Sequence, residues 1–203
     1  MRRVLPAYCA VAAADVVLAS RGDRRVRRFT KPLLMPLLAV HVASTGKSAD
    51  TKPLMLAGLG MSGVGDVALL ADGEGPFAAG LVSFLAAHCC YLAAFAKRRR
   101  GGVRRARWLA AAYAVVWCGL SAVLWPRSGR LRIPVLVYGT VLAAMAVAAL
   151  DTDDPAVAAG GAAFLVSDGI LALETFGGAT VPGADALVML TYTTAQALIT
   201  SLR

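Results

Sequence analysis

The stretch "GLGMSGVGDVALLAD", residues 58–72, poses the central question about this fold. It consists mostly of glycine and aliphatic residues, as a membrane-spanning helix does, yet Asp66 lies in the middle of it. A carboxylate in hydrocarbon costs at least about 2.5–3.5 kcal/mol, and acidic residues in such helices commonly serve a function. Asp66 is therefore the first candidate site residue.

The apolar character of this stretch extends along the whole chain of 203 residues. Hydrophobic residues make up 58% of the sequence and the mean hydropathy is +0.66, whereas soluble domains are roughly 45–50% apolar. Runs of about 18–20 apolar residues are typical of transmembrane helices. We predict an all-α membrane protein with one integral membrane domain over residues 1–203. Its eight transmembrane helices are expected at residues 4–20, 31–45, 53–71, 77–96, 107–125, 133–150, 156–173 and 184–202.

The excess of positive charge is interpreted in terms of lipid. The formal net charge is +9, and two basic stretches, residues 21–31 and 97–107, are expected in loops between apolar segments. Basic residues in such loops set membrane topology and contact anionic lipid headgroups, so we do not predict nucleic-acid binding. The Ala, Val, Gly and Arg content indicates a bacterial source and thus a multi-pass protein of the cell membrane.

The four cysteines do not indicate a metal site. Cys9, Cys89, Cys90 and Cys118 all fall inside apolar segments and none has the spacing of a metal ligand. Neither a disulfide framework nor a zinc site is therefore predicted. No other cofactor is predicted, and the sequence does not indicate an oligomeric state.

Two pairs of residues suggest an internal repeat. Pro32 and Pro134 each begin a predicted helix and are 102 residues apart, and Asp66 and Asp168 are separated by the same interval. The members of each pair lie four predicted helices apart, so the two halves would run in the same direction. The sequence is therefore compatible with a parallel 4+4 repeat, an arrangement that often places a site between the halves.

The predicted helices bring several polar residues to similar depths. Asp66 and Asp168 each lie about five residues from the end of a predicted helix, which places both about 8 Å from the same membrane face. The neighbouring helices begin at that face. They would contribute Lys31 at the membrane edge, His88, Tyr138, and a polar stripe that includes Tyr192 and Gln196. We expect these residues to form one site, with Asp15 structural or facing a cavity.

The two matched aspartates are candidates for acid–base catalysis. Neither has an obvious buried cationic partner in the sequence, Lys31 being expected at a helix edge. Burial favours the neutral acid over the carboxylate, which suits a general acid. The structural alternative for each residue is a hydrogen bond between packed helices.

The sequence "GVGD", residues 63–66, resembles the GxGD signature of intramembrane aspartyl proteases. In that family the second catalytic aspartate precedes the signature, and a PAL motif follows it in some branches. Here Asp168 comes later and the chain contains no PAL. A protease is therefore the weaker alternative.

A second resemblance covers nearly the whole chain. Six segments resemble, in order, landmarks of the YhhN-like lysoplasmalogenase family: "TKPLLMPLL" (30–38), "GDVALL" (65–70), "GLVSFLAAHCCYLAAF" (80–95), "PVLVY" (134–138), "GAAFLVSDGILAL" (161–173) and "LTYTTAQALI" (190–199). The resemblance implies an eight-helix membrane hydrolase. Its substrate would be a lysoplasmalogen, a lysophospholipid with a vinyl-ether chain, and its products a fatty aldehyde and a glycerophospho-alcohol.

Vinyl-ether hydrolysis requires a proton donor and a negative group beside an oxocarbenium ion, as in the glycosidases that use paired carboxylates. We predict that Asp66 and Asp168 share these roles. His88, Tyr138, Tyr192 and Gln196 would position water or substrate, and Lys31 would pair with the lipid phosphate or lie as a flanking residue. The non-enzymatic alternative is a membrane protein that transports or binds a small molecule or lipid and uses the same aspartates.

Overall fold

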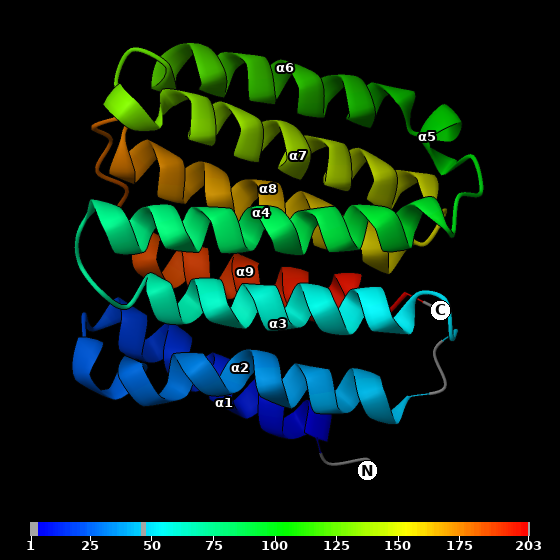
Figure 1. Ribbon diagram of the computed structural model, residues 1–203, viewed down its shortest axis with the longest axis horizontal. Helices are drawn as coiled ribbons and strands as arrows, with labels where there is room; N and C mark the ends of the chain where they lie inside the picture. The colour runs from blue at the N-terminus through cyan, green and yellow to red at the C-terminus, as the bar shows by residue number, and fades with distance from the viewer. Residues whose placement is uncertain (1–3, 46–47, 203) are drawn as a thin grey trace.

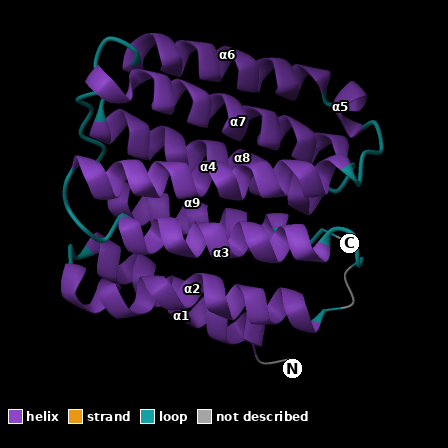
Figure 2. Cartoon of the chain, viewed as in Figure 1, coloured by secondary structure: helices purple, strands orange, loops and turns teal. Residues whose placement is uncertain are grey.

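The computed structural model describes residues 4–45 and 48–202, and within these ranges the regular structure is entirely helical (Figures 1 and 2). The long helices lie side by side in one bundle with the connections at its two ends. Their bounds are α1 Val4–Ser20, α2 Arg24–Ser44, α3 Lys52–Ala68, α4 Glu74–Ala96, α6 Arg107–Leu124, α7 Arg132–Asp151, α8 Pro155–Thr175 and α9 Ala184–Ile199. Two short elements, helix α5 (Gly102–Arg105) and 3-10 helix η1 (Gly129–Leu131), lie between them.

Each predicted apolar segment corresponds to one long helix, but the predicted start of the second helix, at residue 31, is wrong. Helix α2 begins at Arg24, seven residues before the expected position, so most of the basic stretch 21–31 is helical rather than a loop. The side chain of Asp23 accepts a hydrogen bond from the Val26 amide at 3.1 Å, and this N-cap satisfies an amide that the first turn leaves free. Pro32 consequently lies inside α2 instead of at its start.

The helices differ in their suitability for crossing a membrane. By length and composition, four helical segments of the described chain could span one: Glu74–Ala96, Arg107–Leu124, Gly129–Asp151 and Pro155–Thr175, while Val4–Ser20 is apolar but shorter. Large apolar side chains cover the outward face of α6, among them Trp108, Val115 and Val116. Such an exposed apolar surface is typical of contact with lipid or another protein. The composition and these helices make this a membrane protein.

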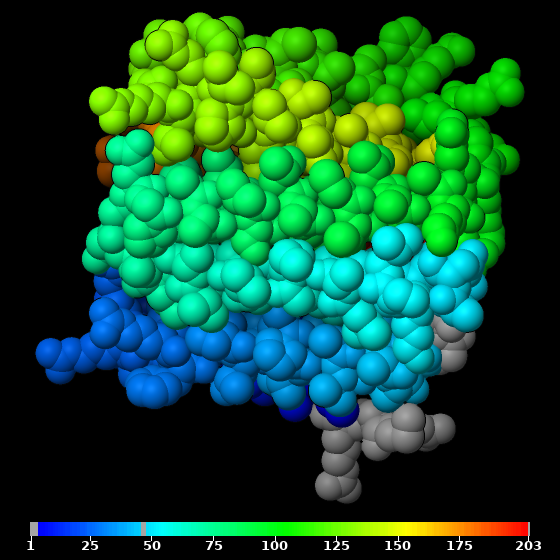
Figure 3. Space-filling view, in the orientation of Figure 1, coloured from blue at the N-terminus to red at the C-terminus, as the bar shows by residue number. Residues whose placement is uncertain are grey.

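The helices α1, α2, α3, α4, α7, α8 and α9 form a closed ring in which each contacts the next, and α6 packs outside against α7. The ring closes where α1 meets α9, and there the buried Tyr8 hydroxyl donates to the Thr193 carbonyl at 2.7 Å. In the space-filling view, α2, α3, α4 and α7 lie side by side across one face (Figure 3). The first and last helices of the chain thus form one wall around a shared interior.

Small residues on α3 allow close contact with α4. A side chain at Gly58 would collide with the ring of Tyr91, and one at Gly65 would collide with the ring of Phe84. Ser62 lies between them and its hydroxyl is 3.4 Å from that of Tyr91. Residues without bulky side chains let helices approach each other closely in lipid. This contact orients the end of α3 that carries Asp66 toward the interior.

Candidate active site

A cavity of about 420 Å³ lies at the end of the bundle where α2 begins. Its walls come from α2, α3, α4, α7, α8 and α9, and they include five of the seven residues predicted for the site: Asp66, Asp168, Lys31, Tyr138 and Tyr192. The other two predicted residues, His88 and Gln196, are fully buried and contact this group from behind. The structure therefore brings all seven residues together.

Asp66 is held by contacts from two helices. The Tyr192 hydroxyl on α9 donates to Asp66 Oδ2 at 2.7 Å, and Lys31 Nζ on α2 lies 3.4 Å from Oδ1. Only 2% of the Asp66 side chain is exposed, and 11% of that of Lys31. The expectation that Asp66 has no cationic partner is therefore wrong. Because α2 begins at Arg24, Lys31 lies two turns inside the helix rather than at its start.

Asp168 has a different set of partners. The Tyr138 hydroxyl on α7 donates to Asp168 Oδ2, and His88 Nε2 on α4 lies 3.1 Å from that hydroxyl and 3.8 Å from the carboxylate oxygen. The Asp168 side chain is 13% exposed, more than that of Asp66. His88 Nδ1 is buried and has no hydrogen-bond partner in the described part of the chain. This carboxyl thus has a phenol and an imidazole beside it.

The partners of the two carboxyls follow one pattern when the eight long helices are divided into α1–α4 and α6–α9. Asp66 and Asp168 lie on the third helix of each half. Each is contacted by the second helix of its own half, through Lys31 or Tyr138, and by the fourth helix of the other half, through Tyr192 or His88. Both carboxyls therefore depend on contacts between the halves.

A buried polar group supports Tyr192. Gln196 Nε2 donates to the Ser62 hydroxyl at 2.9 Å and to the Tyr192 hydroxyl at 3.3 Å. Its Oε1 accepts from the Tyr91 hydroxyl at 2.8 Å. Gln196 donates a hydrogen bond to the Tyr192 oxygen, and the Tyr192 hydroxyl in turn donates to Asp66. Gln196 thus contacts Asp66 only through the phenol.

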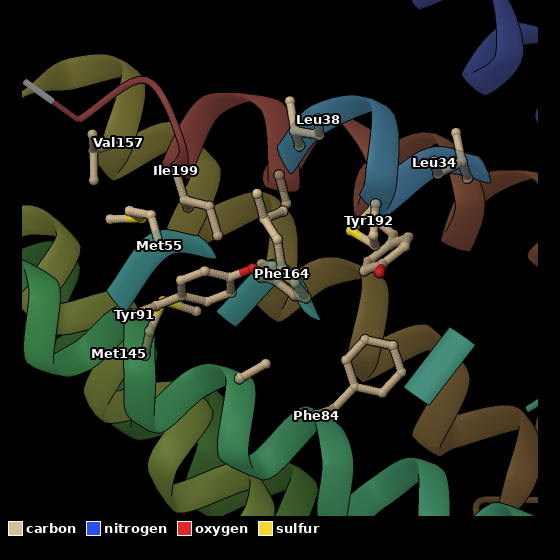
Figure 4. Packing of buried hydrophobic residues seen from close by; sticks show 14 of the residues in the cluster. Leu34, Leu38, Met55, Phe84, Tyr91, Met145, Val157, Phe164, Tyr192 and Ile199 are labelled. Atoms are coloured by element: carbon tan, nitrogen blue, oxygen red, sulfur yellow. The ribbon is translucent and has the colours of Figure 1, made fainter. Parts of the chain in front are cut away.

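A cluster of aromatic rings connects the two carboxyl centres. The Phe164 ring lies between His88 and Tyr192, with ring centroids 4.8 Å and 5.6 Å away, and Phe84 packs edge-on to Tyr192 at 5.8 Å. Figure 4 shows Phe84, Phe164 and Tyr192 among the side chains that fill the interior. Neither phenylalanine was predicted as a site residue, because nothing distinguishes it from other apolar residues of its segment.

A smaller, apolar cleft of about 50 Å³ adjoins the cavity beside Asp168 and Tyr138. Phe84 belongs to the walls of both spaces. The rings of Phe77 and Phe176 meet edge-on at 5.5 Å and form part of the cleft wall. Asp168 is thus placed where a polar space and an apolar one meet.

Asp15 lies in a neighbouring buried contact instead of on the cavity wall. It is fully buried, accepts a hydrogen bond from Thr30 at 2.6 Å, and has Arg27 Nε 3.5 Å from its Oδ2. Across residues 4–45 and 48–202, no three histidine, cysteine or acidic residues are grouped so that they could hold a metal ion. The site therefore presents two carboxyls, two phenols, an imidazole and an ammonium group.

The amino-acid sequence matches a known protein family. A model described as the YhhN family matches residues 26–202. Proteins named lysoplasmalogenase from Mycobacterium bovis and Mycobacterium tuberculosis are each 34% identical over 134 residues, which cover 62% of this chain and 50% of theirs. The chain spans about half the length of these curated relatives. No solved structure matches it.

Proposed function

The chain belongs to the YhhN family, and from this membership we propose that it is a membrane hydrolase of lysoplasmalogens. It would cleave the vinyl-ether bond to release a fatty aldehyde and a glycerophospho-alcohol. The observation that carries the proposal is that Asp66 and Asp168, from distant parts of the chain, line one cavity and each accepts a hydrogen bond from a tyrosine.

The reaction needs acid and base in sequence. One carboxylic acid protonates the carbon of the double bond that is farther from the ether oxygen, which produces an oxocarbenium ion. Water then attacks the carbon bonded to oxygen and loses a proton to a base. The resulting hemiacetal collapses as the glycerol oxygen gains a proton and the hemiacetal hydroxyl loses one, which restores the acid. The balance is addition of one water. General acid–base catalysis of this kind contributes about 10²–10⁴ in rate.

We assign both acid–base roles to the Asp66 and Asp168 pair, since a pair of carboxyls in different surroundings can hold one proton and one charge. Tyr138 and His88 would position water or the substrate oxygen at Asp168, and Tyr192 with Gln196 would do so at Asp66. Lys31 Nζ is 3.4 Å from Asp66. We therefore assign Lys31 to that carboxyl rather than to the lipid phosphate.

The two adjoining spaces suit the two ends of such a lipid. The larger cavity has charged residues in its walls, and the smaller cleft is lined almost wholly by apolar side chains. We place the glycerophosphate end in the former and the first carbons of the alkenyl chain in the latter. The vinyl-ether bond would then lie beside Asp168, at the junction.

We further propose that all eight long helices span the cell membrane and form a parallel 4+4 repeat. The support for the repeat is the matched pattern of partners around Asp66 and Asp168, in which each half supplies its fourth helix to the other carboxyl. The basic residues at the helix ends and in the loops would then contact anionic headgroups.

The test is release of fatty aldehyde from a vinyl-ether lysophospholipid by the purified protein, compared with Asp66→Asn and Asp168→Asn. Asp185→Asn is the matched control, because Asp185 also lines the cavity but is exposed. We expect turnover in the wild type and the control and its loss in both site variants. Turnover in both site variants would refute the paired-acid site. A folded wild type that binds the lipid without releasing aldehyde would indicate transport or lipid binding instead.

A further inference from the structure

The mouth of the cavity carries arginines that the proposed chemistry does not use. Arg24, Arg27 and Arg28, on the first two turns of α2, line the cavity together with Lys31. Their spacing is i, i+3, i+4 and i+7, which places all four on one face of the helix. Arg25 lies between them in sequence, is exposed and does not line the cavity. The basic residues at the start of α2 are therefore concentrated on the side of the helix that lines the cavity.

The four cations differ in the partners they have. Lys31 is paired with Asp66, and Arg27 with the fully buried Asp15. Arg24 is paired with Asp72, but the two side chains are 68% and 80% exposed, so this pair is weak and readily exchanged. The Arg28 side chain has no hydrogen bond, ion pair or ring contact within the described residues. Its guanidinium group is available to an anion in the cavity.

The positions of these cations match the spacing within a lysophospholipid. Arg28 lies three residues closer to the mouth than Lys31, about 4.5 Å along the axis, and Lys31 Nζ is 3.4 Å from Asp66. In the lipid, three glycerol carbons and one ester oxygen separate the ether oxygen from phosphorus. A lipid with its vinyl-ether bond in this cavity, whose wall includes both carboxyls, would therefore have its phosphate on the side of Arg28.

We propose that Arg28, with Arg24 and Arg27, forms the phosphate-binding subsite of this cavity. The inference rests on the proposed function for the identity of the lipid, but phosphate binding itself does not require turnover. A guanidinium group can bind two phosphate oxygens at once, which gives both affinity and orientation. Asp15 serves as a positioning residue that holds Arg27 in the wall.

The test measures binding of a saturated alkyl-ether lysophospholipid, which cannot be hydrolysed as a vinyl ether, to the purified full chain. The same alkylglycerol without phosphate is the second ligand. Arg28→Gln should weaken binding of the phosphate-bearing lipid about tenfold, as expected for loss of a hydrogen bond between charged groups, and leave the alkylglycerol unaffected. Arg28→Lys, which retains the charge but loses the planar fork, should give an intermediate loss.

Arg25→Gln is the matched control, since it removes the same charge from the same turn of α2 outside the cavity. Equal weakening by Arg25→Gln and Arg28→Gln would overturn the proposal in favour of general surface attraction. Equal weakening of both ligands by Arg28→Gln would overturn it in favour of a structural role. If glycerol phosphate or inorganic phosphate bound as tightly as the lipid, with the same dependence on Arg28, the subsite would serve a free phosphate compound instead.

Kinetics separate this inference from the proposed hydrolysis. In an active enzyme Arg28→Gln should raise KM for the lysophospholipid about tenfold, with little change in kcat. Unchanged KM in an enzyme that releases aldehyde would refute the subsite and leave the hydrolase intact. Binding that depends on Arg28 without aldehyde release would refute the hydrolase and leave the subsite intact.

Discussion

The two carboxyl centres have equivalent positions in the bundle but different chemical surroundings. Each carboxyl accepts a hydrogen bond from a tyrosine, but Asp66 has a lysine ammonium 3.4 Å away and almost no exposed surface, whereas Asp168 has a histidine 3.8 Å away and a more open position. A lysine ammonium group favours the charged form of a neighbouring carboxyl, whereas an imidazole can donate or accept a hydrogen bond. The two equivalent positions therefore offer different chemistry.

The largest expected effect comes from removing the carboxyls themselves. Asp66→Asn and Asp168→Asn should each lower kcat by at least about 10²-fold, because each removes an acid–base group. The double variant should be little worse than the more damaged single variant, since residues that act as a unit are not additive. Aldehyde release under substrate saturation measures this. Fully multiplicative losses would mean that the two carboxyls act independently.

The next effect tests the cation that distinguishes the two centres. Lys31→Met should cost about 3 kcal/mol in stability, because it leaves a buried carboxylate without its partner. The melting temperature in detergent measures the loss. Adding Asp66→Asn to Lys31→Met should recover much of it, whereas adding Asp168→Asn should not. Equal recovery from both would show that Lys31 does not distinguish the carboxyls.

A smaller effect should come from the two tyrosines, which are the feature the centres share. Tyr138→Phe and Tyr192→Phe each remove one hydroxyl that donates to a carboxyl. Loss of one such bond to a charged group corresponds to about tenfold in kcat. The ratio of the two losses, measured on one substrate, reports which carboxyl is more sensitive to its phenol. The half-buried Tyr113, on α6 outside the ring, provides the control through Tyr113→Phe.

The smallest effect is expected for the ion pair at the mouth. Asp72→Asn breaks the Arg24–Asp72 pair, whose side chains are largely exposed. Exposed pairs contribute less than about 1 kcal/mol, so the melting temperature should change far less than in Lys31→Met. A comparable loss would indicate that Asp72 has a structural role like that of Lys31.

The sequence predicted the positions of the long helices well, because their apolar runs are long and are separated by charged or glycine-containing segments. The prediction was wrong at the start of α2, where the arginines were expected in a loop although Asp23 caps a helix there. Because of that error, Lys31 was expected at a helix edge instead of beside Asp66, and the arginines that line the cavity were not predicted. The N-cap residue Asp23 was the available signal.

The sequence predicted that the two aspartates lie together, but the reason given for it was inexact. Both line the same cavity, whereas Asp66 lies two residues from the end of α3 and Asp168 seven from the end of α8, instead of the five expected for each. Their catalytic roles remain predictions. Which side chain contacts which could not be predicted, because helix order in the ring decides whether Tyr192 or His88 meets a given carboxyl. Phe164 carries no polar signal, so its place between the two centres comes from packing alone.

The junction of a charged cavity and an apolar cleft at Asp168 bears on how the products of cleavage leave. If a lysoplasmalogen is cut there, its two fragments are left on opposite sides of the junction. The aldehyde would then partition into the bilayer and the glycerophospho-alcohol into water. Because the fragments would enter different phases, neither would accumulate beside the other, and the position of the bond alone would limit product inhibition.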